Sequence, residues 1–139
     1  MVSIIASEKG QGKTKALIKM ANETAKSSDG HVVFIDDDPR HMYDLDREIR
    51  FVVTNEFPLS NYRELIGFIY GILSQNSDIK EIFIDGLGNV IKTFDGEALV
   101  KIVTKFKKMS DEKKLDIIFT INLVPEEVPE EVKDLLIQI

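Results

Sequence analysis

Cysteine and tryptophan are absent from this chain of 139 residues, and histidine occurs only at His31 and His41. Without cysteine, the chain can form neither a disulfide framework nor a thiolate metal site. Two histidines are too few for a histidine-rich metal centre. The composition therefore excludes disulfide-stabilised scaffolds and metal centres built from these two residue types.

Long apolar runs and a basic leader are also missing. The first apolar run covers only residues 2–6, which is too short for a signal peptide. No run approaches the roughly 18 apolar residues of a membrane span. We therefore expect a cytoplasmic protein that makes no membrane contact.

An excess of positive charge is lacking as well. The formal net charge is −6, so bulk attraction to nucleic acid is not expected. Six lysines nevertheless crowd one region, and we interpret them as a solvated helix face and loop. They are Lys101, Lys105, Lys107, Lys108, Lys113 and Lys114.

The length favours a single domain over residues 1–139. Apolar residues make up 43% of the chain and charged residues 30%, as in soluble globular proteins. That is enough to bury a central sheet between helices. No internal repeat, linker or low-complexity segment interrupts the pattern.

Short apolar runs alternate with amphipathic segments along the chain. We predict strands at residues 2–6, 31–35, 50–54, 82–85 and 115–122, and helices at residues 13–26, 60–74, with Ser60 as the N-cap, and 97–109. This alternation implies right-handed crossovers between parallel strands. The predicted fold class is α/β, a three-layer αβα sandwich with a mostly parallel sheet of five or six strands. The run Leu135–Ile139 extends a short helix that ends near Lys133 or forms the sixth strand, and we favour the strand.

A glycine-rich stretch joins the first strand to the first helix. Gly10 and Gly12 let the backbone curl so that consecutive N–H groups point inward. Together with the positive end of the helix, these donors form a cradle for an anion. Lys13 can reach terminal phosphates, and the Thr14 hydroxyl can hold Mg²⁺. The residues expected to bind nucleotide are Ser7, Glu8, Lys9, Gly10, Gln11, Gly12, Lys13 and Thr14.

This stretch contains the core of a Walker A motif, so the chain resembles a P-loop NTPase. The usual pattern is G-x-x-x-x-G-K-[ST], and Ser7 stands where the first glycine is usual. Serine is small enough for the corner between strand and loop. The resemblance implies a domain that binds a nucleotide together with Mg²⁺.

Other polar residues follow the predicted strands directly. The acidic run 36–38 follows the second strand, Asp85 the fourth and Asn122 the fifth. In an open parallel sheet, ligands bind at the carboxyl ends of the strands. We therefore expect these side chains to gather beside the glycine-rich loop.

The run Phe34-Ile35-Asp36-Asp37-Asp38 is similar to a segment of the RecA-like ATPases. This resemblance implies that Asp38 polarises the attacking water, although the family's usual residue is the longer glutamate. It also implies that Asp85 is a Walker B aspartate that holds Mg²⁺ with Thr14, and that Asn122 senses the γ-phosphate. Lys13, Asp38 and Asn122 are thus the expected catalytic residues. DNA recombination is not carried over, because the chain ends where the recombinases continue into DNA-binding loops.

Two related P-loop classes fit less well. The ParA and MinD type carries a signature lysine at the position of Glu8. Nucleoside and nucleotide kinases need an arginine-rich lid, and no arginine falls in an obvious late lid segment. Arg40 or Arg47 could act as a finger on a neighbouring subunit, but surface solvation is the favoured role. All the arginines of the chain are Arg40, Arg47, Arg50 and Arg63.

Two functional hypotheses remain open. The first is Mg²⁺-dependent ATP hydrolysis by a minimal RecA-like domain. The second is a nucleotide-binding switch or assembly subunit with little turnover, which the lack of a clear arginine finger favours. ATP is preferred through the resemblance, since no guanine-reading Asn-Lys-x-Asp sequence occurs. Besides the nucleotide, the sequence leaves open a homo-oligomer or a protein partner.

Overall fold

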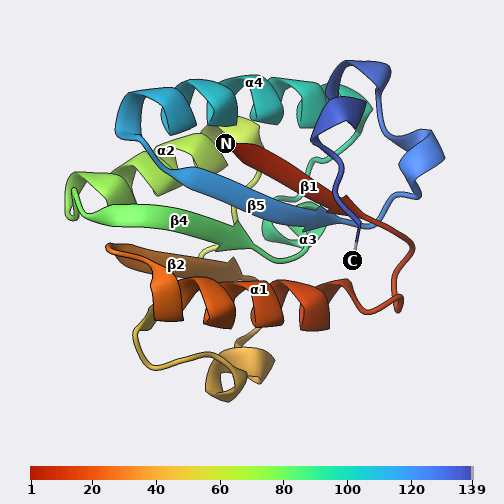
Figure 1. The fold of residues 1–139 in the computed structure, drawn as a ribbon. Helices are drawn as coiled ribbons and strands as arrows, with labels where there is room; N and C mark the ends of the chain where they lie inside the picture. The colour runs from red at the N-terminus through yellow and green to blue at the C-terminus, as the bar shows by residue number, and fades with distance from the viewer. Residues whose placement is uncertain (139) are drawn as a thin grey trace.

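One parallel sheet forms the centre of the molecule (Figure 1). The computed structural model describes residues 1–138, and Ile139 lies outside the described part. The strand order is β1-β5-β4-β2-β3, and every pairing is parallel. The strands are β1 (Val2–Ala6), β2 (His31–Asp36), β3 (Ile49–Val53), β4 (Ile79–Ile84) and β5 (Asp116–Ile121).

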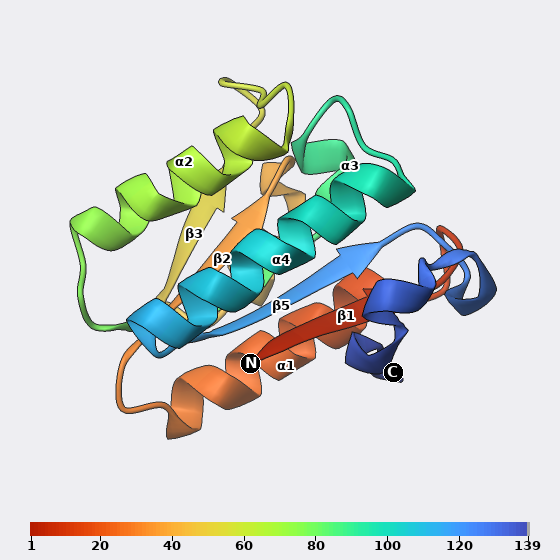
Figure 2. The ribbon, with the colours of Figure 1, turned by 90° about the horizontal axis from the view of Figure 1, so that it is seen from above.

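Helices cover both faces of this sheet. Helix α1 (Lys13–Ser27) lies on one face, whereas α2 (Tyr62–Ser74) and α4 (Gly96–Lys113) lie side by side on the other (Figures 1 and 2). The predicted three-layer α/β class is therefore confirmed. The short elements are α3 (Leu87–Val90) and the 3-10 helices η1 (Pro39–Asp44), η2 (Pro125–Glu127) and η3 (Glu130–Leu135).

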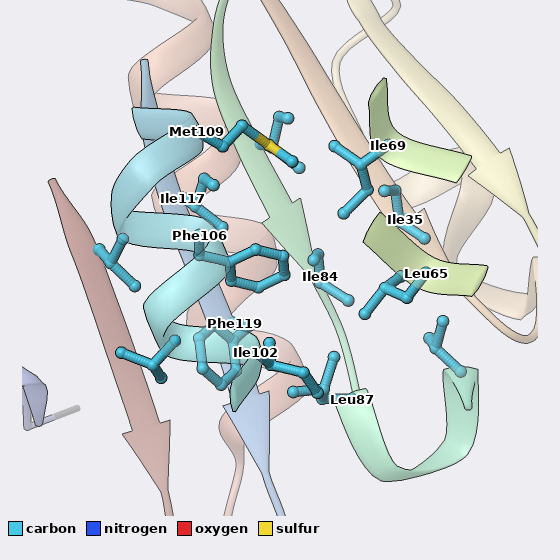
Figure 3. Packing of buried hydrophobic residues seen from close by; sticks show 14 of the residues in the cluster. Ile35, Leu65, Ile69, Ile84, Leu87, Ile102, Phe106, Met109, Ile117 and Phe119 are labelled. Carbon is cyan, nitrogen blue, oxygen red and sulfur yellow. The ribbon is translucent and has the colours of Figure 1, made fainter. Parts of the chain in front are cut away.

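The larger core lies between the sheet and the helices α2 and α4 (Figure 3). Alternate residues of each strand point to opposite faces, so Val33 and Ile35 enter this core. Phe106 of α4 meets Phe119 of β5 edge to face, with ring centroids 5.7 Å apart. Both rings are fully buried. The packing fixes α4 against the middle of the sheet.

A smaller core lies under α1. The intervening strand residues, such as Phe34, point to this side and meet Leu17 and Ala21 of the helix. The Phe34 ring stacks on Phe51 and Phe83 of the two neighbouring strands, at centroid distances of 6.1 and 6.4 Å. This packing holds α1, and with it the glycine-rich loop, against the sheet.

Helix α2 begins at Tyr62, and its N-cap lies one residue after the predicted N-cap, Ser60. Its cap is Asn61, whose side chain accepts a hydrogen bond from the Glu64 N–H at 3.1 Å. The Glu64 carboxylate in turn accepts the N–H of Ser60 at 2.7 Å. The first of these bonds satisfies an N–H group in the first turn that the helix itself leaves unpaired.

The predicted sixth strand is wrong for the residues that the structure describes. Residues up to Leu135 belong to the 3-10 helix η3. Only Leu136 forms a β-bridge, with Ile4 of β1, and the Ile137 N–H donates to the Ile4 carbonyl at 2.9 Å. The 3-10 helix takes up the start of the apolar run, so too few residues remain to pair as a strand. Ile139, the last residue of the predicted strand, lies outside the described residues.

Candidate functional site

The strand order creates a cleft at the carboxyl edge of the sheet. Strand β5 lies between β1 and β4, so its end lies between the glycine-rich loop and Asp85. A cleft of about 610 Å³ opens there. Its lining includes Lys13 and Thr14 of α1, Asp36 of β2, Asp85 after β4, Thr120 of β5 and Asn122 directly after β5. The topology therefore gathers side chains from four separate strand ends.

Two glycines give the loop its shape. Gly10 and Gly12 have φ angles of +88° and +84°, a left-handed conformation that strains any residue with a Cβ. A Cβ built on either glycine meets no atom within 4 Å, so the backbone conformation, not crowding, requires glycine. Gly12 is also the N-cap of α1, and no side-chain hydrogen bond caps this helix end. The first N–H groups of α1 therefore remain for an anion.

Lys13 is buried at the base of the loop and is 6% exposed. Its ammonium group donates to the Ser7 carbonyl at 2.9 Å and to the Glu8 carbonyl at 2.8 Å. Burial lowers the pKa of Lys13, and the charge of Asp85 partly opposes this. The cation is thus held under the loop by weak neutral acceptors, which the stronger charge of a phosphate can replace.

A hydrogen-bonded chain fixes the carboxylate of Asp85. The Thr14 hydroxyl lies 2.9 and 3.2 Å from its two oxygens. The Thr120 hydroxyl donates to Oδ1 of Asp85 at 3.0 Å and accepts the Gly86 N–H at 2.7 Å. Because Asp85 is 8% exposed, these bonds replace most of its contact with water. The structure therefore brings Thr14 and Asp85 together across 71 residues of sequence.

Thr120 is a site residue that sequence reasoning missed. It is the single polar residue in the otherwise apolar run 117–121 of a strand that is buried throughout that run. A buried hydroxyl in such a strand needs a hydrogen-bond partner. A lone threonine in an apolar strand therefore indicates a polar contact, and this signal was present in the sequence. The partner itself depends on the pairing of β4 with β5, which the sequence pattern does not give.

Asp36 is the most deeply placed acid of the run 36–38. It is 3% exposed and accepts the Asp38 N–H at 3.2 Å. Burial, chiefly, and then the charge of Asp85 raise the pKa of Asp36 to about 7. Asp36 and Asp37 both line the cleft. The cleft thus holds an acid that changes its charge near neutral pH.

Asp38 has a different environment. Its carboxylate accepts the Arg40 N–H at 2.8 Å, which makes it the N-cap of η1. The Arg40 side chain lies 3.7 Å from the second carboxylate oxygen. Asp38 does not belong to the residues lining the cleft, whereas Asn122 is exposed and does. The structure therefore places Asn122 beside the loop and leaves Asp38 at the rim.

The donor set of the cleft suits a hard divalent cation. The Thr14 hydroxyl and the Asp85 carboxylate lie within hydrogen-bonding distance of each other, and oxygen is the ligand that Mg²⁺ prefers. Among residues 1–138, no group of three His, Cys, Asp or Glu side chains is arranged to hold a metal ion. A cation here would take few ligands from the protein, as Mg²⁺ does at sites that it shares with phosphates.

The comparisons with known proteins give a structural match only. No protein-family model matches the sequence, and no curated protein matches it. Among solved structures, the fold is similar to that of the flagellar accessory protein FlaH from Methanocaldococcus jannaschii, with a TM-score of 0.64 and 14% identity. The match covers 99% of this chain and 70% of that one. At this identity the likeness shows a shared fold.

The sheet is parallel throughout with helices on both faces, as the predicted α/β class requires. In residues 1–138, no helix combines the length and the apolar character that crossing a bilayer requires.

Proposed function

We propose that this domain binds ATP with Mg²⁺ in the cleft and hydrolyses it. The observation that carries the proposal is the convergence of Lys13, Thr14 and Asp85 on one cleft, beside an uncapped helix N-terminus. The Walker A stretch supplies Lys13 and Thr14, and the fold brings Asp85 to the same cleft from the end of β4. The choice of ATP over GTP rests on the RecA-like resemblance.

Phosphate binding is the task of the loop. The N–H groups at the start of α1 and the loop backbone donate to phosphate oxygens. Lys13 exchanges the carbonyls of Ser7 and Glu8 for the terminal phosphates, which gain more from its charge. The glycine conformations keep the loop backbone close to the ligand.

Thr14 and Asp85 are the residues that would hold Mg²⁺. When bound, the ion neutralises charge on the phosphates and orients them for attack. Thr120 keeps the Asp85 carboxylate in place through its hydroxyl, which is itself anchored on the Gly86 N–H. Asn122, exposed at the end of β5, is the proposed contact to the γ-phosphate.

Asp38 is the proposed residue that polarises the attacking water, as the family resemblance implies. Replacement by asparagine keeps the size of the side chain and its capping acceptor but removes the base. If hydrolysis runs through Asp38, Asp38→Asn should lower kcat about 100-fold or more and leave ATP affinity within about twofold. Steady-state phosphate release and ATP titration measure the two quantities.

Asp37→Asn is the matched control, since it removes the same charge one residue away. A loss of turnover in Asp37→Asn but not in Asp38→Asn would show that Asp37, and not Asp38, is the base. Wild-type turnover no faster than ATP decay in buffer would reject hydrolysis altogether.

A nucleotide-binding switch with little turnover is the second candidate. One observation favours it: the Asp38 carboxylate is engaged in capping η1 and in contact with Arg40. In that case ATP binding acts by ordering the loop and the segment at η1 for a second copy or a protein partner. ATP binding without turnover, unchanged by Asp38→Asn, supports this candidate.

A further inference from the structure

Residues of α2 and α4 line a second concave surface. These two helices lie on the sheet face opposite α1 (Figures 1 and 2). The concave surface has a volume of about 420 Å³. Its lining consists of Tyr62, Arg63, Ile66 and Tyr70 from α2, and Lys105 and Lys108 from α4. We call it the α2–α4 groove. None of these residues lines the nucleotide cleft.

The two walls of the groove differ in chemistry. Tyr62, Ile66 and Tyr70 follow one another at intervals of four residues, so they share one side of α2. Lys101 and Lys105 are likewise four residues apart on α4. From the sequence alone we predicted a lysine-rich region, which we interpreted as a solvated helix face and loop. The fold adds an aromatic wall and an arginine from another helix.

Positive charge dominates this groove locally. Within residues 1–138, Arg63 and Lys105 have no carboxylate within 4.0 Å. Lys101 pairs with Glu97 at 3.1 Å and Lys108 with Glu112 at 3.8 Å. Both are exposed ion pairs between residues four apart on α4, and ion pairs of this kind contribute little binding energy. No acidic residue lines the groove itself.

Tyr62 lies close to several of these cations. The Arg63 guanidinium lies 5.9 Å and the Lys101 ammonium 5.7 Å from the centroid of its ring. The hydrogen bond from Arg63 is the largest cause that lowers the pKa of Tyr62, and the charges of Lys101 and Lys105 add to it. An aromatic side chain thus lies among three cations at the edge of the groove.

We propose that the α2–α4 groove binds single-stranded nucleic acid. Cations that follow the phosphate backbone and aromatic rings that stack on bases are the two components of sequence-tolerant strand binding. An acidic polypeptide would need the cations but gain little from the tyrosines. The combination of cations and tyrosines in the groove therefore favours a strand.

The net charge of −6 opposes this binding only weakly at close range. At about 0.1 M salt, charges more than about 10 Å apart are largely screened. The phosphates of a bound strand would lie against Arg63 and Lys105, which are both exposed. Binding should consequently weaken steeply with salt, with a logarithmic slope of about −0.7 for each phosphate contacted.

Fluorescence anisotropy with a labelled oligo-dT of about twelve nucleotides, at about 50 mM salt, tests the proposal. The double variant Arg63→Ala/Lys105→Ala should weaken binding at least tenfold and reduce the salt slope. The control Lys19→Ala/Lys26→Ala removes the same charge from exposed positions on α1 and should change affinity less than twofold. Tyr70→Leu, which keeps an apolar side chain, should weaken binding about fivefold through lost stacking.

Three results would overturn the proposal. One is no binding of the strand by the wild-type protein, and another is equal binding by Arg63→Ala/Lys105→Ala. The third is displacement of the strand by poly-glutamate as readily as by unlabelled oligo-dT, which would indicate an acidic protein partner instead. The variant Lys13→Ala should retain strand binding in full, so a failed nucleotide site does not affect this test.

Discussion

Asp85→Asn is expected to abolish the magnesium dependence of ATP binding. In wild-type protein, Mg²⁺ should tighten ATP binding because the Thr14 hydroxyl and the Asp85 carboxylate lie within hydrogen-bonding distance of each other. Asparagine keeps the shape and the hydrogen bond to Thr120 but lacks the charge. We expect the magnesium-dependent part of the affinity to fall about 100-fold, the upper end of the cost of losing a partner group near a metal. ATP titration with Mg²⁺ and with EDTA measures it.

The same variant should lower the pKa of Asp36. The Asp85 charge helps to raise the pKa of Asp36, so removing it relieves repulsion between two buried carboxylates. The pH dependence of urea unfolding with EDTA present measures the pKa change, and ATP titration measures the magnesium dependence. Asp29→Asn, an exposed acid before β2, is the matched control and should change neither quantity. If ATP binding by Asp85→Asn still depends on magnesium, Asp85 does not hold the metal ion.

Asp36→Asn is expected to stabilise the protein strongly above neutral pH and hardly at all near pH 4. The pKa of Asp36 is raised from 3.8 to about 7, so the folded state holds this proton more tightly than the unfolded state. Wild-type stability should therefore fall as pH rises from about 4 to about 7. Asparagine cannot ionise, and it keeps an acceptor for the Asp38 N–H. At 1.4 kcal/mol per pKa unit, the gain at pH 8 is up to about 4 kcal/mol.

Urea unfolding at several pH values, with EDTA present, measures this difference. The free-energy gap between Asp36→Asn and wild type should widen steadily between about pH 4 and pH 7 and then level off. Asp29→Asn again serves as the control and should run parallel to wild type. A gap that stays constant with pH would mean that the asparagine acts through packing, and that Asp36 does not hold a proton at neutral pH.

The fold class was predictable because each buried strand is a short apolar run with a clear boundary. The run 2–6 and the glycine-rich loop after it define β1 and the start of α1 without any tertiary information. The strand order was not predictable, because the alternation of elements does not say that β5 lies between β1 and β4. The pairing of Asp85 with Thr120 follows from that order alone.

The tail shows why a short apolar run is ambiguous. Leu135–Ile139 has the composition of a strand, yet a 3-10 helix reaches Leu135 and only one bridge forms at Leu136. Local hydrogen bonding at Glu130–Leu135 outweighs strand propensity there. The acidic run 36–38 was ambiguous in a similar way, because sequence does not tell which carboxylate enters the cleft. The structure turns Asp36 and Asp37 into it and engages Asp38 in capping η1.

Calorimetric titration of ATP into wild type and Lys13→Ala, each with and without Mg²⁺, tests the central claim most directly. Lys19→Ala is the matched control, since Lys19 is an exposed lysine further along α1 that does not line the cleft. We predict magnesium-dependent binding to wild type and Lys19→Ala, and a loss of at least about 100-fold in Lys13→Ala, because Lys13 is the only buried cation among residues 1–138. Equal ATP affinity in wild type and Lys13→Ala, or no heat with wild type in any condition, would contradict the assignment of this cleft as a nucleotide site.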